Sequence, residues 1–297
     1  MTEVMTTTVE SASKKVSISR KLPTAIIGER INPTGRKTLQ EELKAGNFDT
    51  VKADALAQIE AGAVILDVNA GVPGADESAL LVKMIEVLSE RTDVPLCIDT
   101  ANVKALEAAL KVYSGKALVN SVNGEEEKLE TVLPLIKQHN AAVIGLTMDD
   151  DGIPKTLEKR IEIAGKIIDR ATKLGIAVED IVIDPLAMSV GADDQAGKMA
   201  LDAVEAIVKK FGVNITMGCS NISFGIPDRE LLNGTFLAMA IRCGLTCPIT
   251  NPLFDEVVTS ILAADLAMGR DEFATNWIGG YRKRQAAEKN KPVSEPS

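Results

Sequence analysis

The sequence predicts an α/β fold of the (β/α)8 TIM-barrel class in a single domain. Three observations support it: the length, the alternation of short apolar runs with helical stretches, and the polar residues that end several of those runs. At 297 residues, the chain has the usual size of one eight-stranded α/β barrel. A doubly wound open sheet would also alternate, but eight strands with repeated polar ends favour the barrel.

The predicted strands are continuously apolar, as expected of parallel strands buried on both faces. In chain order they cover residues 25–27, 64–68, 96–98, 117–119, 142–147, 181–183, 214–217 and 246–250. Residues 1–22 are rich in Thr, Ser and Lys and lack periodicity, so we expect a mobile leader there. The barrel is therefore predicted over residues 23–280, with a charged tail over residues 281–297.

Helices are expected between the strands. Residues 75–91 are one example, with Leu80, Leu81, Met84 and Leu88 at helical spacing. The other predicted helices are a stretch that ends near residues 61–62 and residues 103–112, 125–138, 155–174, 196–211 and 229–243. This order, a strand followed by a helix, is the repeat from which an α/β barrel is built.

Composition argues against several classes of function. Hydrophobic residues make up 45% of the chain and charged residues 25%, and no apolar run approaches the roughly 20 residues that span a bilayer. The first 21 residues lack the apolar segment of a signal peptide, so we expect a cytoplasmic protein without a membrane role. The net charge of −9 disfavours nucleic acid as a partner.

The cysteines and the single histidine give little support to metal or covalent chemistry. Cys97, Cys219, Cys243 and Cys247 are too scattered for a disulfide scaffold and are expected to be reduced. The last two lack a nearby His or a second close pair, so no metal site is predicted. His139 lies far from any predicted strand end and is expected at the surface, which argues against a serine triad.

Polar side chains stand where predicted strands end. Asp67, Asn69, Asp99, Asn120 and Asp184 each close an apolar run. One of them alone could simply cap the following helix. In a barrel, however, all strands open onto one face at their C-terminal ends, so these side chains should meet in one pocket. Carboxylates and amides together suit a flat heterocycle with an amidine-like edge, because a carboxylate accepts two parallel hydrogen bonds from it.

Residues 218–225 form a loop with glycine at both ends. Within it, Ser220, Asn221 and Ser223 offer neutral polar groups but no strong acid or base. No Lys stands at a strand end to form a Schiff base. We therefore expect chemistry by positioning and hydrogen bonding, without a covalent protein intermediate.

Seven motifs, in order, resemble those of the pterin-binding methyltransferases. More narrowly, the chain resembles methyltetrahydrofolate:corrinoid-protein methyltransferases and the folate domain of cobalamin-dependent methionine synthase. The resemblance covers about residues 24–268 and includes residues 229–240. The motifs are GERIN at 28–32, LDVN at 66–69, CIDT at 97–100, VNS at 119–121, IGLTM at 144–148, IDPL at 183–186 and SNIS at 220–223.

The resemblance implies roles for individual residues. In the family, the counterparts of Asp99, Asn120 and Asp184 hold the pterin ring, and the counterpart of Asn221 bonds near N5, the atom that gives up the methyl group. Asn221 and Asp184 are thus the expected catalytic residues, and Arg229 is expected to orient the network. N5 is a poor leaving group unless it gains positive charge, which a preorganised network can stabilise. The expected pterin-binding set is Asp67, Asn69, Asp99, Asn120, Asp184, Ser220, Asn221 and Arg229.

The resemblance also implies partners. The substrate would be methyltetrahydrofolate or tetrahydrofolate, and the nucleophile would be Co(I) of a cobalamin. The chain has no Asp-x-His-x-x-Gly motif, so the corrinoid is expected on a separate protein that docks over the open barrel face. A homodimer is expected by resemblance. The sequence leaves open the direction of transfer, the original methyl donor, the corrinoid protein and the consequence of Phe224, which replaces a polar residue of some relatives.

Two other functions remain open from the sequence. A dihydropteroate synthase has a similar fold and binds pterins, but it would need basic residues near the last strand, where residues 247–252 are neutral. A non-catalytic subunit that presents methyltetrahydrofolate to another enzyme is the second alternative. Asn221 argues against it, because a binder needs no group at N5.

Overall fold

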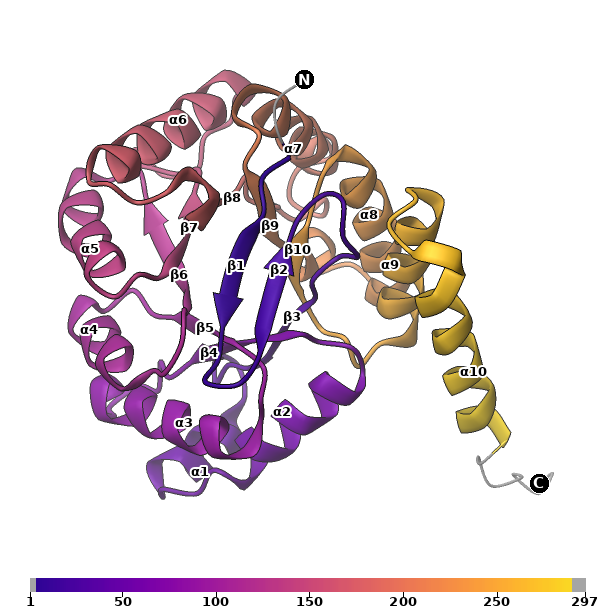
Figure 1. Cartoon of the computed structure of the whole chain (residues 1–297), viewed down its shortest axis with the longest axis horizontal. Helices are drawn as coiled ribbons and strands as arrows, with labels where there is room; N and C mark the ends of the chain where they lie inside the picture. Colours follow the sequence, from indigo (N-terminus) through magenta and orange to yellow (C-terminus); the bar gives the residue numbers. More distant parts are fainter. Residues whose placement is uncertain (1–3, 290–297) are drawn as a thin grey trace.

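Eight parallel strands close into a barrel at the centre of the molecule (Figure 1). The computed structural model describes residues 4–289. Around the barrel the strands follow the order β10-β3-β4-β5-β6-β7-β8-β9. Their bounds are β3 Ile27–Ile31, β4 Ile65–Asn69, β5 Leu96–Asp99, β6 Leu118–Asn123, β7 Ala142–Leu146, β8 Ile181–Asp184, β9 Asn214–Gly218 and β10 Cys247–Thr250. The predicted single-domain (β/α)8 barrel is therefore confirmed.

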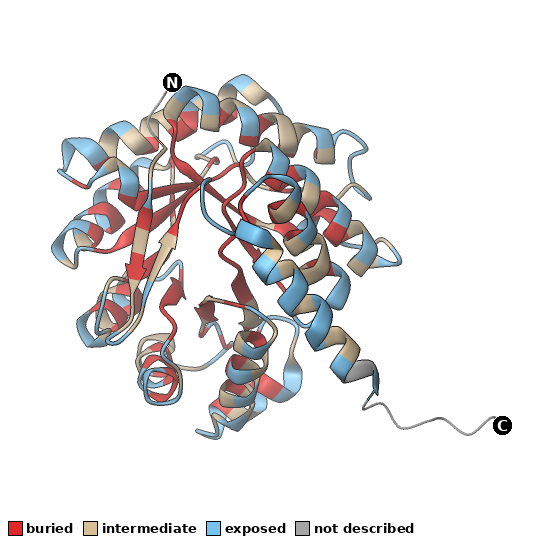
Figure 2. Ribbon diagram, turned by 45° about the vertical axis from the view of Figure 1, so that its right-hand side comes forward, coloured by how far each residue is buried: buried red, intermediate tan, exposed pale blue. Residues whose placement is uncertain are grey.

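Helices surround the barrel, and their buried faces point inward (Figure 2). The α-helices are α1 Lys37–Lys44, α2 Asp49–Glu60, α3 Glu77–Arg91, α4 Val103–Val112, α5 Glu126–Gln138, α6 Leu157–Lys173, α7 Ala196–Phe211, α8 Arg229–Cys243, α9 Asp255–Ala267 and α10 Thr275–Lys289. Short 3-10 helices are η1 Val178–Asp180, η2 Cys219–Ser223 and η3 Glu272–Ala274. None of the helices in residues 4–289 is long and apolar enough to cross a membrane.

Two helices, α1 and α2, occupy the region where one helical stretch was expected before residue 62. The chain turns between them at Gly46, whose φ of +72° lies in the left-handed region that favours glycine. The later helices α9 and α10 were not among the predicted elements. Helix α10 continues across residues 280 and 281, the predicted boundary between the barrel and the charged tail, and residues 290–297 of that tail lie outside the described residues.

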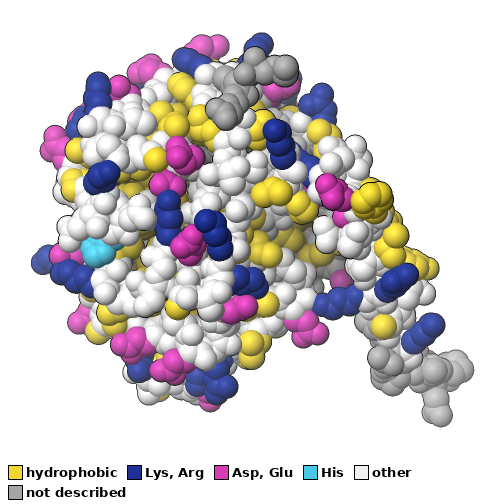
Figure 3. All heavy atoms as spheres, viewed as in Figure 1, with side chains coloured by type: hydrophobic (Ala, Val, Ile, Leu, Met, Phe, Trp, Pro, Cys, Tyr) yellow, Lys and Arg dark blue, Asp and Glu magenta, His cyan; other side chains and the backbone are white. Residues whose placement is uncertain are grey.

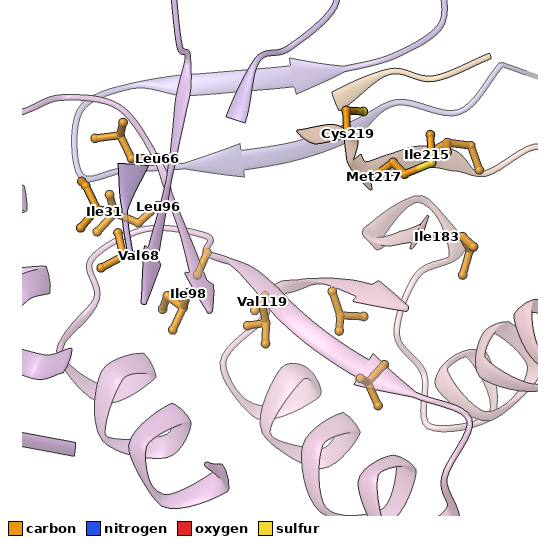
Figure 4. Close-up of a cluster of buried hydrophobic side chains, with 14 of the residues drawn as sticks. Ile31, Leu66, Val68, Leu96, Ile98, Val119, Ile183, Ile215, Met217 and Cys219 are labelled. Atoms are coloured by element: carbon orange, nitrogen blue, oxygen red, sulfur yellow. The ribbon is translucent and has the colours of Figure 1, made fainter. Parts of the chain in front are cut away.

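Side chains along each strand alternate between two buried environments. Leu66 and Val68 of β4 face outward and pack in the layer between the strands and the helices. Figure 4 shows this layer, with residues from β4, β5, β6, β8 and β9 in one cluster. Ile65 belongs instead to the barrel interior, and the same alternation directs Asp67 inward. Both faces of the strands are thus buried, as the apolar runs indicated.

The barrel interior changes from apolar to polar along the strands. Its apolar part includes Ile27, Cys97, Leu118, Val182 and Cys247, and all of them are buried. The next inward positions, two residues further along several strands, carry polar side chains. Apolar side chains therefore fill the barrel interior toward the N-terminal ends of the strands. The polar side chains are accessible at the C-terminal ends of the strands.

A two-stranded antiparallel hairpin covers the opposite end of the barrel (Figure 1). Its strands are β1 Thr7–Glu10 and β2 Lys15–Ile18, and the side chains of Val9 and Ile18 are fully buried in the interior cluster. This differs from the leader without regular structure that was expected over residues 1–22. Strands of four residues are too short to give a clear periodic signal, and their burial depends on contacts with the distant barrel.

Acidic and basic side chains are interspersed over the face that carries the hairpin (Figure 3). Many of them pair with each other, as Lys14 does with Asp93 at 3.3 Å and Lys15 with Glu10 at 3.3 Å. Exposed pairs of this kind contribute little to stability. The functional groups lie at the other end of the barrel.

Candidate functional site

A cavity of about 440 Å³ opens at the C-terminal ends of the barrel strands. Five of the eight predicted site residues line it: Asp67, Asp99, Asn120, Asp184 and Asn221. Backbone register explains why they meet. Asp99 is the register partner of Asn120, and Asp184 that of Leu146, which also lines the cavity.

Two amide side chains each hold a carboxylate on another strand. Asn69 Nδ2 donates to Asp99 Oδ2 at 2.9 Å, and Asn120 Nδ2 donates to Asp67 Oδ1 at 3.2 Å. Asn69 does not itself line the cavity, so it acts on the site through Asp99. These bonds fix the carboxylates before a ligand binds and leave their other acceptor positions available.

The carboxyl groups of Asp67 and Asp99 lie close together in a poorly hydrated place. Burial and the neighbouring Asp99 raise the pKa of Asp67 well above its usual range, and the hydrogen bond from Asn120 opposes this only in part. Burial also raises the pKa of Asp99, against the hydrogen bond from Asn69. Two adjacent negative charges repel each other. The pair is therefore stabilised when one carboxyl group keeps a proton or when a ligand donates hydrogen bonds to it.

Asp184 is suited to hold a proton near neutral pH. Its side chain is buried, and this burial raises its pKa to about 7. The backbone N–H of Leu186 donates to Asp184 Oδ1 at 2.7 Å, which lowers the pKa and fixes the carboxyl group. A group that titrates near pH 7 can both donate and accept a proton under ordinary conditions.

The segment that carries Asn221 is held from both sides. Ser220 Oγ donates to Glu29 Oε1 at 2.8 Å, and Arg229 Nη2 donates to the carbonyl oxygen of Ser220 at 2.8 Å. Arg229 Nε also donates to Ser223 Oγ at 2.9 Å. Neither Ser220 nor Arg229 is among the residues that line the cavity. Their direct contact with a pterin stays a prediction, whereas their contacts position η2.

Asn221 lies over Gly218, the last residue of β9. A Cβ atom built on Gly218 would come within 3.0 Å of Asn221 Nδ2. The backbone of Gly218 has a φ of −71°, which any residue can adopt, so the glycine is required for space rather than for conformation. The side-chain amide of Asn221 therefore occupies the space that the Cβ atom of any residue other than glycine would fill at position 218.

The structure adds cavity residues that were not predicted. Glu29, Arg30, Asn32, Thr34 and Arg36 come from β3 and the loop that follows it. Burial raises the pKa of Glu29, and its hydrogen bond from Ser220 opposes the shift. The predicted first strand stopped at residue 27, whereas β3 continues to residue 31. With the longer strand, Glu29 would have been recognised as one more polar residue at a strand end.

Phe224 does not line the cavity. Its side chain is 69% exposed, and its ring lies 6.0 Å from the Arg229 guanidinium carbon. At this distance the ring can make a weak cation–π contact with Arg229. The effect of Phe224 on a ligand remains a prediction.

Other reactive groups are not suited to nucleophilic or metal chemistry. Burial raises the pKa values of the Cys97 and Cys219 thiols well above the usual range, so neither is poised as a thiolate. His139, expected at the surface, is half-buried at the C-terminal end of α5. Among residues 4–289, no group of three or more His, Cys, Asp or Glu side chains is arranged to hold a metal ion.

Comparisons with known proteins agree with this geometry. Residues 28–251 match the family described as "Pterin binding enzyme". A methylcorrinoid:tetrahydrofolate methyltransferase from Eubacterium limosum is 31% identical over 264 residues, which cover 87% of this chain and 96% of that protein. Methionine synthase from Mycobacterium leprae (strain TN) is 29% identical over 82% of this chain, and the match spans only 21% of that longer protein.

Solved structures with the same fold include dihydropteroate synthases. One from Xanthomonas albilineans, in complex with indole-2-carboxylic acid and 6-chloroguanine, has a TM-score of 0.68 and 18% identity over 89% of this chain and 98% of that chain. One from Clostridium difficile, in the presence of pteroic acid, has a TM-score of 0.65 and 21% identity over 82% of this chain and 97% of that chain. Likeness at this level of identity concerns the fold.

Proposed function

The chain belongs to the pterin-binding enzymes, and from that premise we propose that it is a methyltransferase acting between N5 of (methyl)tetrahydrofolate and the cobalt of a separate corrinoid protein. One observation carries the proposal: Asp99, Asn120, Asp184 and Asn221 line a single cavity. The 31% identity to a methylcorrinoid:tetrahydrofolate methyltransferase supports the choice of reaction.

The cavity has the donors and acceptors that a pterin ring requires. Asp99 and Asn120 come from the neighbouring strands β5 and β6, Asp184 comes from β8, and all three present carboxyl or amide groups to the cavity. A carboxyl group with a raised pKa can accept from ring N–H groups when ionised and donate when protonated. In this proposal these three residues hold the amidine edge of the ring.

Asn221 and Asp184 would act near N5. The methyl group leaves N5 more easily when positive charge develops on that nitrogen, and a fixed amide dipole can stabilise the charge. Asp184, with a pKa of about 7, is able to keep a proton in the same network. Glu29, Ser220 and Arg229 would position η2, since their hydrogen bonds connect it to β3 and α8.

The first test combines binding with methyl transfer for Asn221→Ala. The variant should bind methyltetrahydrofolate within a few-fold of the original protein, and its rate of transfer to Co(I) cobalamin should fall by about 10²–10³, because it loses a group that acts mainly in the transition state. Titration calorimetry measures affinity, and loss of the Co(I) absorbance measures rate. Asn276→Ala, at an exposed position of α10, is the matched control.

The result distinguishes the enzyme from a carrier. A non-catalytic binding subunit would show the same small changes for Asn221→Ala and Asn276→Ala. No binding of methyltetrahydrofolate by the original protein would contradict the proposed function itself. The corrinoid partner and a homodimer stay predictions from the family resemblance, and a cytoplasmic location stays a prediction from the N-terminal sequence.

A dihydropteroate synthase is the second candidate, because two cations, Arg30 and Arg36, line the cavity beside β10. A pyrophosphate leaving group would need such cations. However, β10 itself contributes the apolar Ile249 to the cavity. An assay for dihydropteroate formed from the pterin diphosphate and 4-aminobenzoate tests this candidate, and we expect no product.

A further inference from the structure

Arg160 is a buried cation that the proposed reaction does not use. It lies near the start of α6, and only 4% of its surface is exposed. Its hydrogen bonds go to main-chain carbonyl groups rather than to a carboxylate. Burial lowers the pKa of Arg160, and the charge of Asp184 opposes that shift. A buried guanidinium is unfavourable unless its donors are used, so the position of those carbonyl groups matters.

The guanidinium group of Arg160 ties the chain after β8 to the start of α6. Its Nη1 atom donates to the carbonyl oxygens of two successive residues, Pro185 and Leu186, the second at 2.7 Å. Its Nε atom donates to the carbonyl oxygen of Pro154, in the loop before α6, at 3.2 Å. The planar group with several donors thus fixes two neighbouring peptide units at once.

The peptide unit between Pro185 and Leu186 connects Arg160 to the site. Its carbonyl oxygen accepts from Arg160, and its N–H donates to Asp184 Oδ1 at 2.7 Å. Because a peptide unit is planar, holding the carbonyl group also orients the N–H group. Arg160 is therefore one peptide unit away from the carboxyl group of Asp184.

Leu186 has a backbone conformation that needs such support. Its φ of +66° lies in the left-handed region, which is unfavourable for a residue with a Cβ atom. Leu186 and the next residue, Ala187, line the cavity. Without the two bonds from Arg160, this turn could relax, and the N–H of Leu186 would move away from Asp184.

The charge of Arg160 also acts on Asp184. Burial raises the pKa of Asp184 to about 7, whereas the N–H groups of Leu186 and Gly218 and the charge of Arg160 lower it. The nearby thiols of Cys219 and Cys247 stay neutral, because burial raises their pKa values. The other charged side chains that line the same cavity are Glu29, Arg30, Arg36, Asp67 and Asp99.

We infer that Arg160 is a positioning residue, which holds the turn after β8 and thereby orients the carboxyl group of Asp184 toward the ligand. It acts through Leu186 and does not line the cavity itself. The kinetic part of this inference rests on the proposed function. The effect on Asp184 does not, because its titration can be followed without a ligand.

The first measurement is the pKa of Asp184 in Arg160→Gln. Carbon NMR of the full chain with labelled aspartate carboxyl groups follows the titration, and the signal that is missing in Asp184→Asn identifies the residue. The pKa should rise from about 7 to about 8, because the carboxylate loses a nearby cation and a well-placed N–H donor. A residue that only stabilised the fold would leave this pKa unchanged.

The second measurement is the pH profile of methyl transfer from methyltetrahydrofolate to Co(I) cobalamin. In Arg160→Gln the midpoint that follows Asp184 should move upward by the same amount as the pKa measured by NMR. The rate at neutral pH should also fall by about ten-fold, because a positioned group is displaced.

Arg20→Gln is the matched control. Arg20 Nη1 donates to the carbonyl oxygens of two successive residues, Gly212 at 2.9 Å and Val213 at 3.0 Å, as Arg160 does. These residues precede β9 and so lie at the opposite end of the barrel. The variant should leave the pKa of Asp184 and the pH profile unchanged.

Arg160→Lys separates the charge from the hydrogen bonds. It keeps the cation but not the planar arrangement of donors. Its rate at neutral pH should lie between those of Arg160→Gln and the original protein, and the pKa of Asp184 should rise less than in Arg160→Gln. A rate equal to that of the original protein at every pH would show that the bonds to the turn are not needed, even if Arg160→Gln does not fold.

Two other results would overturn the inference. An unchanged pKa of Asp184 in Arg160→Gln would leave Arg160 as a residue of the fold alone. Equal upward shifts in Arg160→Gln and Arg20→Gln would mean that loss of any such arginine loosens the barrel. A shift in Arg160→Gln alone, with no methyl transfer by the original protein, would support the role of Arg160 and contradict the proposed function.

Discussion

Asn221 shows how one side chain depends on the residue beneath it. The amide crosses Gly218, and η2, which carries it, is connected through Ser220 to Glu29 and Arg229. These contacts fix the backbone of η2 but leave the exposed side chain of Asn221 to be placed by the space above β9. A preorganised amide needs little rearrangement when charge develops on the ligand. Filling the free space at Gly218 should therefore lower the rate of methyl transfer more than the free energy of unfolding.

Gly218→Ala tests this dependence. The new methyl group would lie 3.0 Å from Asn221 Nδ2, closer than such atoms normally approach, so the amide must move. We expect kcat to fall by about ten- to hundred-fold, because small misplacements of a positioned group are costly. Steady-state transfer of methyl groups to Co(I) cobalamin measures the effect.

Gly197→Ala is the control for that substitution. Gly197 lies in α7, and the nearest atom to its added Cβ would be 3.5 Å away, which is ordinary contact. This variant should keep full activity and gain slightly in helix stability. Activity in Gly218→Ala equal to that of Gly197→Ala would show that Asn221 has room to adjust, contrary to the expectation.

Residue patterns predicted the acidic half of the site better than the rest. Asp67, Asp99, Asn120 and Asp184 stand directly at the ends of apolar strands, where barrel topology alone brings them together. Glu29 was not predicted as a site residue, because the segment GERIN, residues 28–32, is too polar to be recognised as a strand. Its place in β3 comes from pairing with β4 and β10, which sequence periodicity does not record.

At the scale of elements, the β1–β2 hairpin is the part that local sequence did not predict. It pairs with itself and is held to the barrel by Asn214, whose Nδ2 donates to Thr7 Oγ1 and to the Ile18 carbonyl oxygen, each at 2.9 Å. These contacts join residues about 200 positions apart in the chain, so no local pattern could reveal them. The hairpin closes the end of the barrel opposite the cavity.

Ile18→Ala tests the role of the hairpin. The side chain of Ile18 is fully buried in the interior cluster, so its truncation should lower the free energy of unfolding by about 2–5 kcal/mol. Because the cavity is at the other end of the barrel, the dissociation constant for methyltetrahydrofolate should stay within about two-fold. Urea unfolding and calorimetry measure the two quantities.

Ile278→Ala, at a position of α10 that is 42% exposed, provides the comparison. It should change the free energy of unfolding by less than about 1 kcal/mol. Equal stability of the two variants would mean that the hairpin contributes little to closing the barrel. A large loss of ligand binding in Ile18→Ala alone would mean that the two ends are coupled.

At the scale of the whole molecule, the barrel separates stability from ligand binding. Apolar layers fill the interior below the site and the space between strands and helices. The polar end instead carries Glu29, Asp67, Asp99 and Asp184, whose pKa values are all raised by burial. A raised pKa means that the ionised group is disfavoured in the folded protein. Ionisation of these four carboxyl groups should therefore lower the free energy of unfolding.

Asp184→Asn tests how far ionisation of one of these carboxyl groups lowers the free energy of unfolding as the pH rises. A carboxyl group with a higher pKa in the folded state contributes its full stability below its unfolded pKa, near pH 4, and loses it as the pH rises through the folded value of about 7. Between pH 5 and pH 8, Asp184→Asn should therefore gain about 2–3 kcal/mol in free energy of unfolding relative to the original protein. Urea unfolding at several pH values measures this difference. Asp151→Asn, at an exposed loop position, should follow the original protein at every pH. A difference that shrinks with rising pH would mean that binding partners in the site, rather than burial, control Asp184.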